Sequence, residues 1–251
     1  MGKRKKSINS RIGMVDEARG LSILLMLLYH AGFDLVFLYG ISIPFFTAPQ
    51  MDLLRDFFAG VFIFISGAAC RLSHNNLKRG VLCFLCGMGL TVFTWVFVPQ
   101  ELILFGILHM LGLSMILFHL LQSLLDKLKF PIIGIAVCAL LYWFCMNIGM
   151  GRLGPFLLPE SVSQITWLFP IGIIAPGFFS SDYFPLFPWI FVFFSGSYFG
   201  VYLIEHRLPE FVYKTHLKFL AFVGRHTLWI YLFHQPVLYA CFTLFFTLFP
   251  Q

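Results

Sequence analysis

The hydrophobic pattern of this chain consists of long apolar runs separated by short polar segments. Seven runs are each close to the roughly 20 residues that an α-helix needs to cross the hydrocarbon core of a bilayer. Because they are continuously apolar rather than alternating, they predict helices and not the strands of a β-barrel. The predicted fold class is an all-α polytopic membrane protein, a single bundle of about seven transmembrane helices. The predicted spans are 16–38, 52–71, 80–98, 101–122, 131–149, 187–204 and 227–248.

An eighth apolar stretch, residues 165–179, is shorter and is interrupted by Pro170 and Pro176. If it does not cross, fifteen of the 17 Lys and Arg residues fall on one side, which the positive-inside rule assigns to the cytoplasm. If it crosses, the last four change sides and the division weakens to eleven against six. The pattern therefore predicts a short re-entrant or half-spanning helix there, a cytoplasmic N-terminus and an external C-terminus. Residues 1–14 would be a basic cytoplasmic segment and 150–186 an outer lid.

Composition supports this class and excludes others. The 251 residues are 59% hydrophobic and only 11% charged, which excludes a soluble globular domain. The net charge of +6 comes from basic residues between the spans, so it reports topology and not nucleic-acid binding. The first run is too long and too polar for a cleavable signal, and no linker divides the chain, so we expect one domain over 1–251. Cys83 and Cys86 form a CxxC without a second ligand pair, which favours buried apolar packing over metal binding.

Titratable residues interrupt the first span at His30 and Asp34. Such residues cost roughly 2.5–3.5 kcal/mol each at the centre of a membrane helix, so they indicate a functional site. Four residues apart, they share one helix face. The carboxylate would orient the imidazole and raise its basicity, as a general base requires. The alternative is that the two groups satisfy each other at a helix contact.

Helix rise places three histidines at a similar depth. At about 1.5 Å per residue, His30 lies roughly 16 Å above Arg19 and His234 about 12 Å above Arg225, while His109 lies about 12 Å in from the outer end of its span. A lone intramembrane histidine usually packs, but three at one level favour a shared cavity. Zinc is not expected, because the three would come from separate helices without a local spacing motif.

Basic residues gather at the predicted cytoplasmic ends of the helices. Guanidinium groups match phosphate oxygens in a bidentate manner, so this cluster would suit a polyphosphate ligand. The positive-inside rule alone explains most of these residues. Arg19 and Arg225 are the exceptions, because Arg19 follows Asp16 at the mouth of the first helix and Arg225 directly precedes the last span. The others in the cluster are Arg71, Lys78 and Arg79.

Five motifs spread over the chain carry a resemblance to a known family. They are Arg11-x4-Asp16-x2-Arg19-Gly20 followed by His30, then FIFISG at 62–67, GILHMLG at 106–112, DYFPLFPW at 182–189 and GRHTLWIYLFHQP at 224–236. In this order they resemble bacterial membrane proteins related to the catalytic domain of heparan-α-glucosaminide N-acetyltransferase. That group belongs to the wider transmembrane acyltransferases.

The resemblance implies transfer of an acyl group, expected to be acetyl, from cytoplasmic acyl-CoA to an acceptor across the membrane. The acceptor would be an amino sugar, a glycan or a lipid headgroup, and no metal would take part. His30 with Asp34 would deprotonate the acceptor or take the acyl group itself, and His109 or His234 would polarise the thioester carbonyl. Asp182 and Tyr183 would bind the acceptor. The CoA site would be formed by Asp16, Arg19, Arg71, Arg79 and Arg225.

The resemblance also has a departure. In the animal lysosomal enzyme the proposed catalytic histidine follows the first motif helix, whereas this chain has no histidine between His30 and His74. Either His30 takes over that role or the chemistry differs. The animal enzyme's lumenal domain is absent as well, so its glucosamine acceptor does not carry over.

Two other function classes stay open: a proton-coupled transporter that uses the histidines as a relay, and a non-enzymatic membrane partner protein. The transporter would be expected to show repeat halves, and the sequence has none. The expected location is a bacterial cytoplasmic membrane. Expected partners are membrane lipids, acyl-CoA, an extracytoplasmic glycan or lipid acceptor and a second copy in a homodimer, with no nucleic acid.

Overall fold

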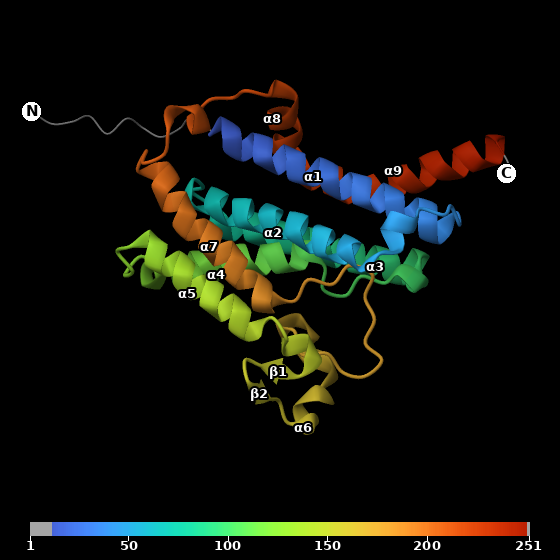
Figure 1. Cartoon of the computed structure of the whole chain (residues 1–251), viewed down its shortest axis with the longest axis horizontal. Coiled ribbons are helices and arrows are strands. Elements are labelled where there is room, and N and C mark those ends of the chain that lie inside the picture. The colour runs from blue at the N-terminus through green and yellow to red at the C-terminus, as the bar shows by residue number, and fades with distance from the viewer. Residues whose placement is uncertain (1–11, 250–251) are drawn as a thin grey trace, which may run out of the picture. The chain divides into compact units, whose positions relative to one another are not determined.

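Seven helices of the computed structural model are long and apolar enough to cross a membrane, which confirms the predicted polytopic helical class (Figure 1). The structure describes residues 12–249, so Arg11 and the basic residues before it lie outside the described part. Most helix ends fall within a few residues of the predicted spans. The helices are α1 (Gly13–Phe33), α2 (Pro49–Arg71), α3 (Asn76–Phe97), α4 (Ile107–Leu125), α5 (Pro131–Cys145), α7 (Leu186–Ile204) and α9 (Thr227–Leu248).

Short elements fill the connections. A π-helix, η1 (Asp34–Leu38), extends α1, and a two-stranded hairpin pairs β1 (Arg152–Leu153) with β2 (Phe156–Leu157). In the stretch 165–179, the helical part is the 3-10 helix η5 (Thr166–Ile171), which at about 2 Å per residue is far shorter than the roughly 30 Å hydrocarbon core. The remaining elements are η2 (Pro44–Thr47), η3 (Pro99–Glu101), η4 (Ile148–Met150), α6 (Glu160–Ser163), η6 (Glu210–Tyr213) and α8 (Lys218–Arg225).

The chain divides into two compact units, which are described separately. The terminal unit consists of Met1–Phe62 and Tyr202–Gln251, and the central unit consists of Ile63–Val201. The divisions fall inside α2 and α7, so each of these helices belongs to both units. Figure 1 shows α1, α8 and α9 of the terminal unit lying together.

In the terminal unit, α1 and α9 run side by side in the same chain direction. His30 contacts His234, Asp34 contacts Gln235, and further along the Tyr39 hydroxyl lies 2.9 Å from that of Thr243. Residue numbers therefore rise together on the two helices. Parallel spans require an odd number of crossings between them, and the five intervening long helices supply that number. The parallel pairing thus agrees with seven crossings and not with an eighth at 165–179.

Glycines let helices of the central unit approach closely. A Cβ on Gly67 of α2 would collide with the Phe193 carbonyl of α7, and a Cβ on Gly196 would collide with that of Phe64. Contacts of this kind are typical of membrane helices, which lack a hydrophobic driving force for association and depend on close packing. The fully buried core of this unit includes Ile63, Met110, Phe118 and Phe193.

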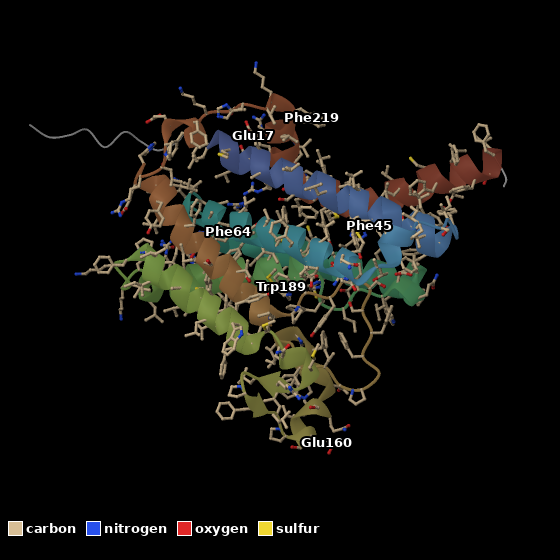
Figure 2. All side chains as sticks on the ribbon, viewed as in Figure 1. Glu17, Phe45, Phe64, Glu160, Trp189 and Phe219 are labelled. Carbon is tan, nitrogen blue, oxygen red and sulfur yellow. The ribbon has the colours of Figure 1, made fainter. Side chains whose placement is uncertain are left out.

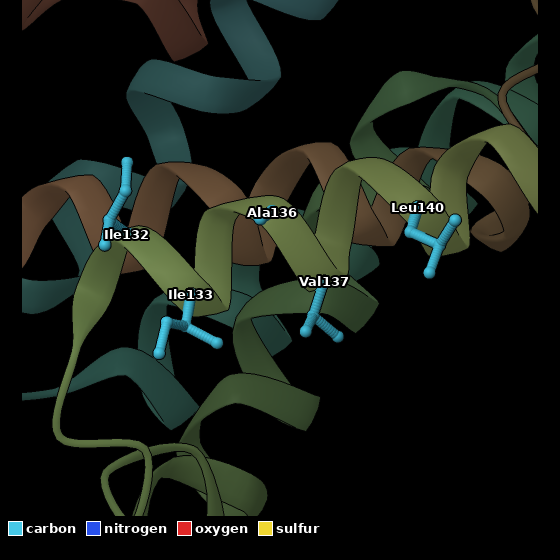
Figure 3. Close-up of a pocket in the computed structure, with 5 residues that line it drawn as sticks. All are labelled: Ile132, Ile133, Ala136, Val137 and Leu140. Carbon is cyan, nitrogen blue, oxygen red and sulfur yellow. The ribbon is translucent and has the colours of Figure 1, made fainter.

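The outer surface of α5 carries an open apolar depression of about 350 Å³ (Figure 3). Its lining consists only of aliphatic side chains, of which Ile132 and Leu140 are more than half exposed. Such a surface suits lipid chains and offers no group for chemistry, so it is not a candidate active site.

The fourth span begins at Ile107 and not at residue 101 as predicted. The preceding residues pair with the segment before α7: Ser181 N–H donates to Leu102 O (3.0 Å), and Phe184 N–H donates to Phe105 O (2.9 Å). These bonds satisfy the backbone outside a helix, so the apolar sequence there does not need to become helical. The sequence pattern could not reveal a partner segment about 80 residues away.

Candidate active site

The helix α8 packs directly against the first turns of α1 in the terminal unit. A Cβ on Gly20 would collide with the Leu220 carbonyl oxygen, and one on Gly224 would collide with the Asp16 carbonyl oxygen. Only glycine at both positions permits this backbone contact. Arg225 follows Gly224 directly, and Arg19 belongs to the turn that Gly224 contacts. The structure therefore brings together the two arginines that the sequence singled out.

A buried carboxylate holds the start of α8. Glu17 is 8% exposed, and its Oε1 accepts hydrogen bonds from the backbone N–H groups of His216 and Leu217, the latter at 2.8 Å. Figure 2 labels Glu17 on α1 and Phe219 on α8. Because these N–H groups directly precede α8, the carboxylate also complements the positive end of the helix dipole. Two residues further along α1, Arg19 lies 3.9 Å from Asp16.

Further along α1, His30 meets His234 of α9. Their ring centroids are 4.8 Å apart, with the planes tilted by 55°. His30 lies eleven residues beyond Arg19, which corresponds to about 16 Å along α1. Of the three histidines expected at one level, the structure brings His30 and His234 into contact near the middle of α1.

Four residues beyond His30 and one beyond His234, a polar pair joins the two spans. Asp34 is 1% exposed, and its Oδ1 accepts a hydrogen bond from Gln235 Nε2 at 2.8 Å. Both backbones are irregular at this level: a π-helix begins at Asp34, and Pro236 follows Gln235 in α9. Pro236 has no N–H to donate to the carbonyl four residues earlier. Non-helical backbone at membrane depth occurs where it lines a cavity or is buried in protein, and π-helices occur often at functional sites.

The hydrogen bond of His234 defines the state of its ring. Nδ1 lies 2.5 Å from the carbonyl oxygen of Tyr231, and a carbonyl can only accept, so Nδ1 carries the hydrogen. In the neutral imidazole, Nε2 then has a lone pair. This atom is buried and has no hydrogen-bond partner within residues 12–249. His234 therefore presents an available base.

His109 of the central unit differs in this respect. Gly106 N–H donates to its Nδ1 (3.2 Å), and its Nε2 lies 3.3 Å from the hydroxyl of Thr91, which donates to the Ile103 carbonyl (2.7 Å). Both ring nitrogens thus hold the turn before α4. Because α4 begins at Ile107, His109 stands in its first turn and not about 12 Å inside the helix, so the depth estimate from the sequence was wrong for this residue. A catalytic role for His109 stays a prediction and would require breaking one of these bonds.

The predicted acceptor-binding residues Asp182 and Tyr183 also serve the central unit. Asp182 Oδ2 accepts a hydrogen bond from Ile107 N–H at the start of α4 (3.1 Å). The Tyr183 hydroxyl donates to the Phe169 carbonyl (2.6 Å), and burial raises the pKa of Tyr183. These contacts stabilise the segment before α7. Contact of Asp182 or Tyr183 with an acceptor stays a prediction.

Two of the predicted CoA-binding arginines lie in the central unit. Arg71 is largely buried: it pairs with Asp126, donates to the Ser197 carbonyl (3.1 Å) and stacks over the Phe118 ring. Its Nη2 is buried and has no hydrogen-bond partner within residues 12–249, so only this group is left for a phosphate. Arg79 lies exposed in the first turn of α3. Arg71 therefore offers a ligand only a buried guanidinium, whereas the guanidinium of Arg79 is exposed.

Within residues 12–249, no group of three or more His, Cys, Asp or Glu side chains is arranged to hold a metal ion. The chemistry available in the terminal unit is that of imidazoles, a carboxylate, an amide and arginines.

A family model described as the catalytic domain of heparan-alpha-glucosaminide N-acetyltransferase matches residues 11–236. The chain belongs to this family. The match includes both histidines of the His30–His234 contact and both residues of the Asp34–Gln235 pair. Comparisons with curated proteins and with solved structures found no match.

Membership in this family indicates a transmembrane acetyltransferase. Two residues of the terminal unit were missing from the sequence-based site, Glu17 and Gln235. Gln235 stands beside His234 in a motif that was noted, and an amide within an apolar span was the available signal. Glu17 lies beside Asp16 at the start of the first span, and only the packing of α8 shows that it is buried.

Proposed function

We propose that the protein transfers an acetyl group from acetyl-CoA, bound at the cytoplasmic side, to an acceptor on the other side of the membrane. The acceptor class is an amino sugar, a glycan or a lipid headgroup. The setting is a bacterial cytoplasmic membrane, with the N-terminus inside and the C-terminus outside.

The observation that supports this proposal is the contact between α1 and α9. The α1–α8 crossing at one end carries Arg19 and Arg225, and the His30–His234 pair lies about 16 Å further along α1. Arginines suit the phosphates of CoA, whose long, thin pantetheine arm would extend along the helices toward the imidazoles. Asp16, 3.9 Å from Arg19, would orient that guanidinium.

The reaction requires a base and a way to carry the proton. The acceptor nitrogen or oxygen attacks the acetyl carbonyl, a new bond to that carbon forms, and the carbon–sulfur bond breaks. The proton of the acceptor passes to His234 Nε2 and from there to the leaving sulfur, so that CoA departs as the thiol. We assign His30 to contact with the acceptor and the thioester. Asp34 and Gln235 hold the two helices in register. An acetyl-imidazole on His30 is the covalent variant of the same transfer.

The first test is binding of acetyl-CoA and longer acyl-CoAs to the purified protein, measured by calorimetry and thermal shift. We expect saturable binding that weakens about tenfold or more in Arg19→Ala and in Arg225→Ala, since each loses a charge-assisted contact. Arg207→Ala is the matched control, because Arg207 lies in the same unit and pairs with Glu205 at the surface. No binding to any CoA species would overturn the proposal and favour the transporter class.

A further inference from the structure

Only the nitrogen of the Gln235 side-chain amide has a hydrogen-bond partner among residues 12–249. Its Nε2 donates to Asp34, and because a carboxylate only accepts, this bond fixes which end of the amide faces Asp34. Oε1 therefore points away from the carboxylate. It is buried and has no hydrogen-bond partner in the part of the chain that the structure describes.

His234, the residue before Gln235, presents a second buried hydrogen-bond acceptor. His234 Nε2 is buried and also lacks a partner among residues 12–249, while its Nδ1 is engaged by the Tyr231 carbonyl. Buried polar atoms are nearly always paired, and the exceptions need an explanation. Two such acceptors on adjacent residues, beside the π-helix of α1 and the proline of α9, indicate that a hydrogen-bond donor binds there.

We propose that Gln235 is the specificity-determining residue for the acceptor, which it binds through Oε1. This inference rests on the proposed function. A neutral primary amine has two hydrogens and one lone pair, so it would donate to Gln235 Oε1 and His234 Nε2 and keep its lone pair for attack on the thioester. A hydroxyl has one hydrogen and would leave one of the two acceptors unpaired. The pair therefore selects an amine over an alcohol.

The test is a steady-state assay of CoA release with two matched probes, glucosamine and glucose, which differ at one position by an amine and a hydroxyl. We expect the wild type to prefer glucosamine. Gln235→Met removes both polar atoms while keeping the chain length, and we expect it to raise the KM for glucosamine about tenfold. The KM for acetyl-CoA should stay within about twofold.

Controls separate binding from folding. Val237→Met makes a substitution on the exposed face of the same helix and should leave both KM values unchanged. Gln235→Glu keeps an acceptor oxygen and, when protonated, a donor toward Asp34, so it should retain most of the affinity for glucosamine. If Gln235→Met fails to bind acetyl-CoA and is therefore misfolded, Gln235→Asn takes its place, because the shorter amide cannot reach Asp34 and the acceptor together.

Each outcome bears on the inference. An unchanged KM for glucosamine in a folded Gln235 variant, or equal use of glucose and glucosamine by the wild type, would overturn it. So would a wild type that binds acetyl-CoA yet acetylates neither probe. A wild type that binds no acyl-CoA would overturn the proposed function itself, which distinguishes the two failures.

Discussion

At the residue scale, the histidines of this protein differ in what their ring nitrogens do. His234 uses Nδ1 for a backbone carbonyl and keeps Nε2 available, whereas both nitrogens of His109 are engaged with the turn before α4. An imidazole needs an available nitrogen to move a proton. From these hydrogen bonds we expect a chemical role for His234 and a structural role for His109.

The His30–His234 pair can be tested directly. We expect His30→Ala and His234→Ala each to lower CoA release by about 10²–10⁴-fold, the usual contribution of a positioned acid or base. Thermal melting in detergent should change little, because neither ring is fully buried. Turnover at the wild-type rate in either variant would remove that residue from the mechanism.

His109→Ala is expected to act on stability instead. It leaves the Gly106 N–H and the Thr91 hydroxyl without their ring partners in a fully buried place, at a cost of about 1–3 kcal/mol. His119→Ala, an exposed residue of the same helix, is the control. Thermal or denaturant unfolding measures the difference. A His109→Ala protein that melts like the control would contradict the anchoring role.

The sequence predicted part of this site for a physical reason. Charged and polar groups inside apolar spans are few, so His30, Asp34 and His234 were conspicuous. The predicted orientation of His30 by Asp34 depended on spacing along one helix. The structure also gives Asp34 a hydrogen bond from Gln235, which depends on the π-helix that begins at Asp34 and on the rotation of α9 about its axis. Neither can be deduced from one sequence.

At the element scale, α8 shows how tertiary contacts create a helix that its own sequence would not sustain. Eight residues are too few for a stable isolated helix in water. The sequence pattern did not predict α8 as a separate helix, since α8 lies in a polar connection before the last span. Glu17 and the glycine contacts with α1 supply the missing stabilisation.

A substitution at Gly224 tests that crossing. Gly224→Ala places a methyl group against the Asp16 carbonyl, so we expect about 1–3 kcal/mol of destabilisation and weaker acetyl-CoA binding as α8 moves from α1. Gly89→Ala is the control: its Cβ would meet no atom within 4 Å, and alanine favours a helix by roughly 0.5–1 kcal/mol over glycine. Equal melting temperatures for the two variants would contradict the tight contact.

The long spans themselves were predictable, because hydrophobicity over about 20 residues is a strong local signal. The start of α4 was not, since Leu102 and Phe105 pair with a segment far along the chain. The local hydrophobic pattern thus predicts which segments form spans. Non-local hydrogen bonds decide where some of them end.

At the scale of the whole molecule, the parallel pairing of α1 and α9 makes membrane topology testable. Seven crossings place the two ends of the chain on opposite sides. We expect green fluorescent protein fused to the N-terminus to fluoresce, and the same protein fused to the C-terminus to stay dark, because it would be exported unfolded. Fluorescence from both fusions would mean an even number of crossings and would contradict the pairing.

The same pairing has a consequence for biosynthesis. The imidazole pair needs one ring from the first span and one from the seventh, so every other span is made before the centre can exist. A chain still emerging from the ribosome carries His30 but has no partner for it. Under the proposed function, acetyl transfer would begin only after insertion of the last helix, and an incomplete chain in the membrane would consume no acetyl-CoA.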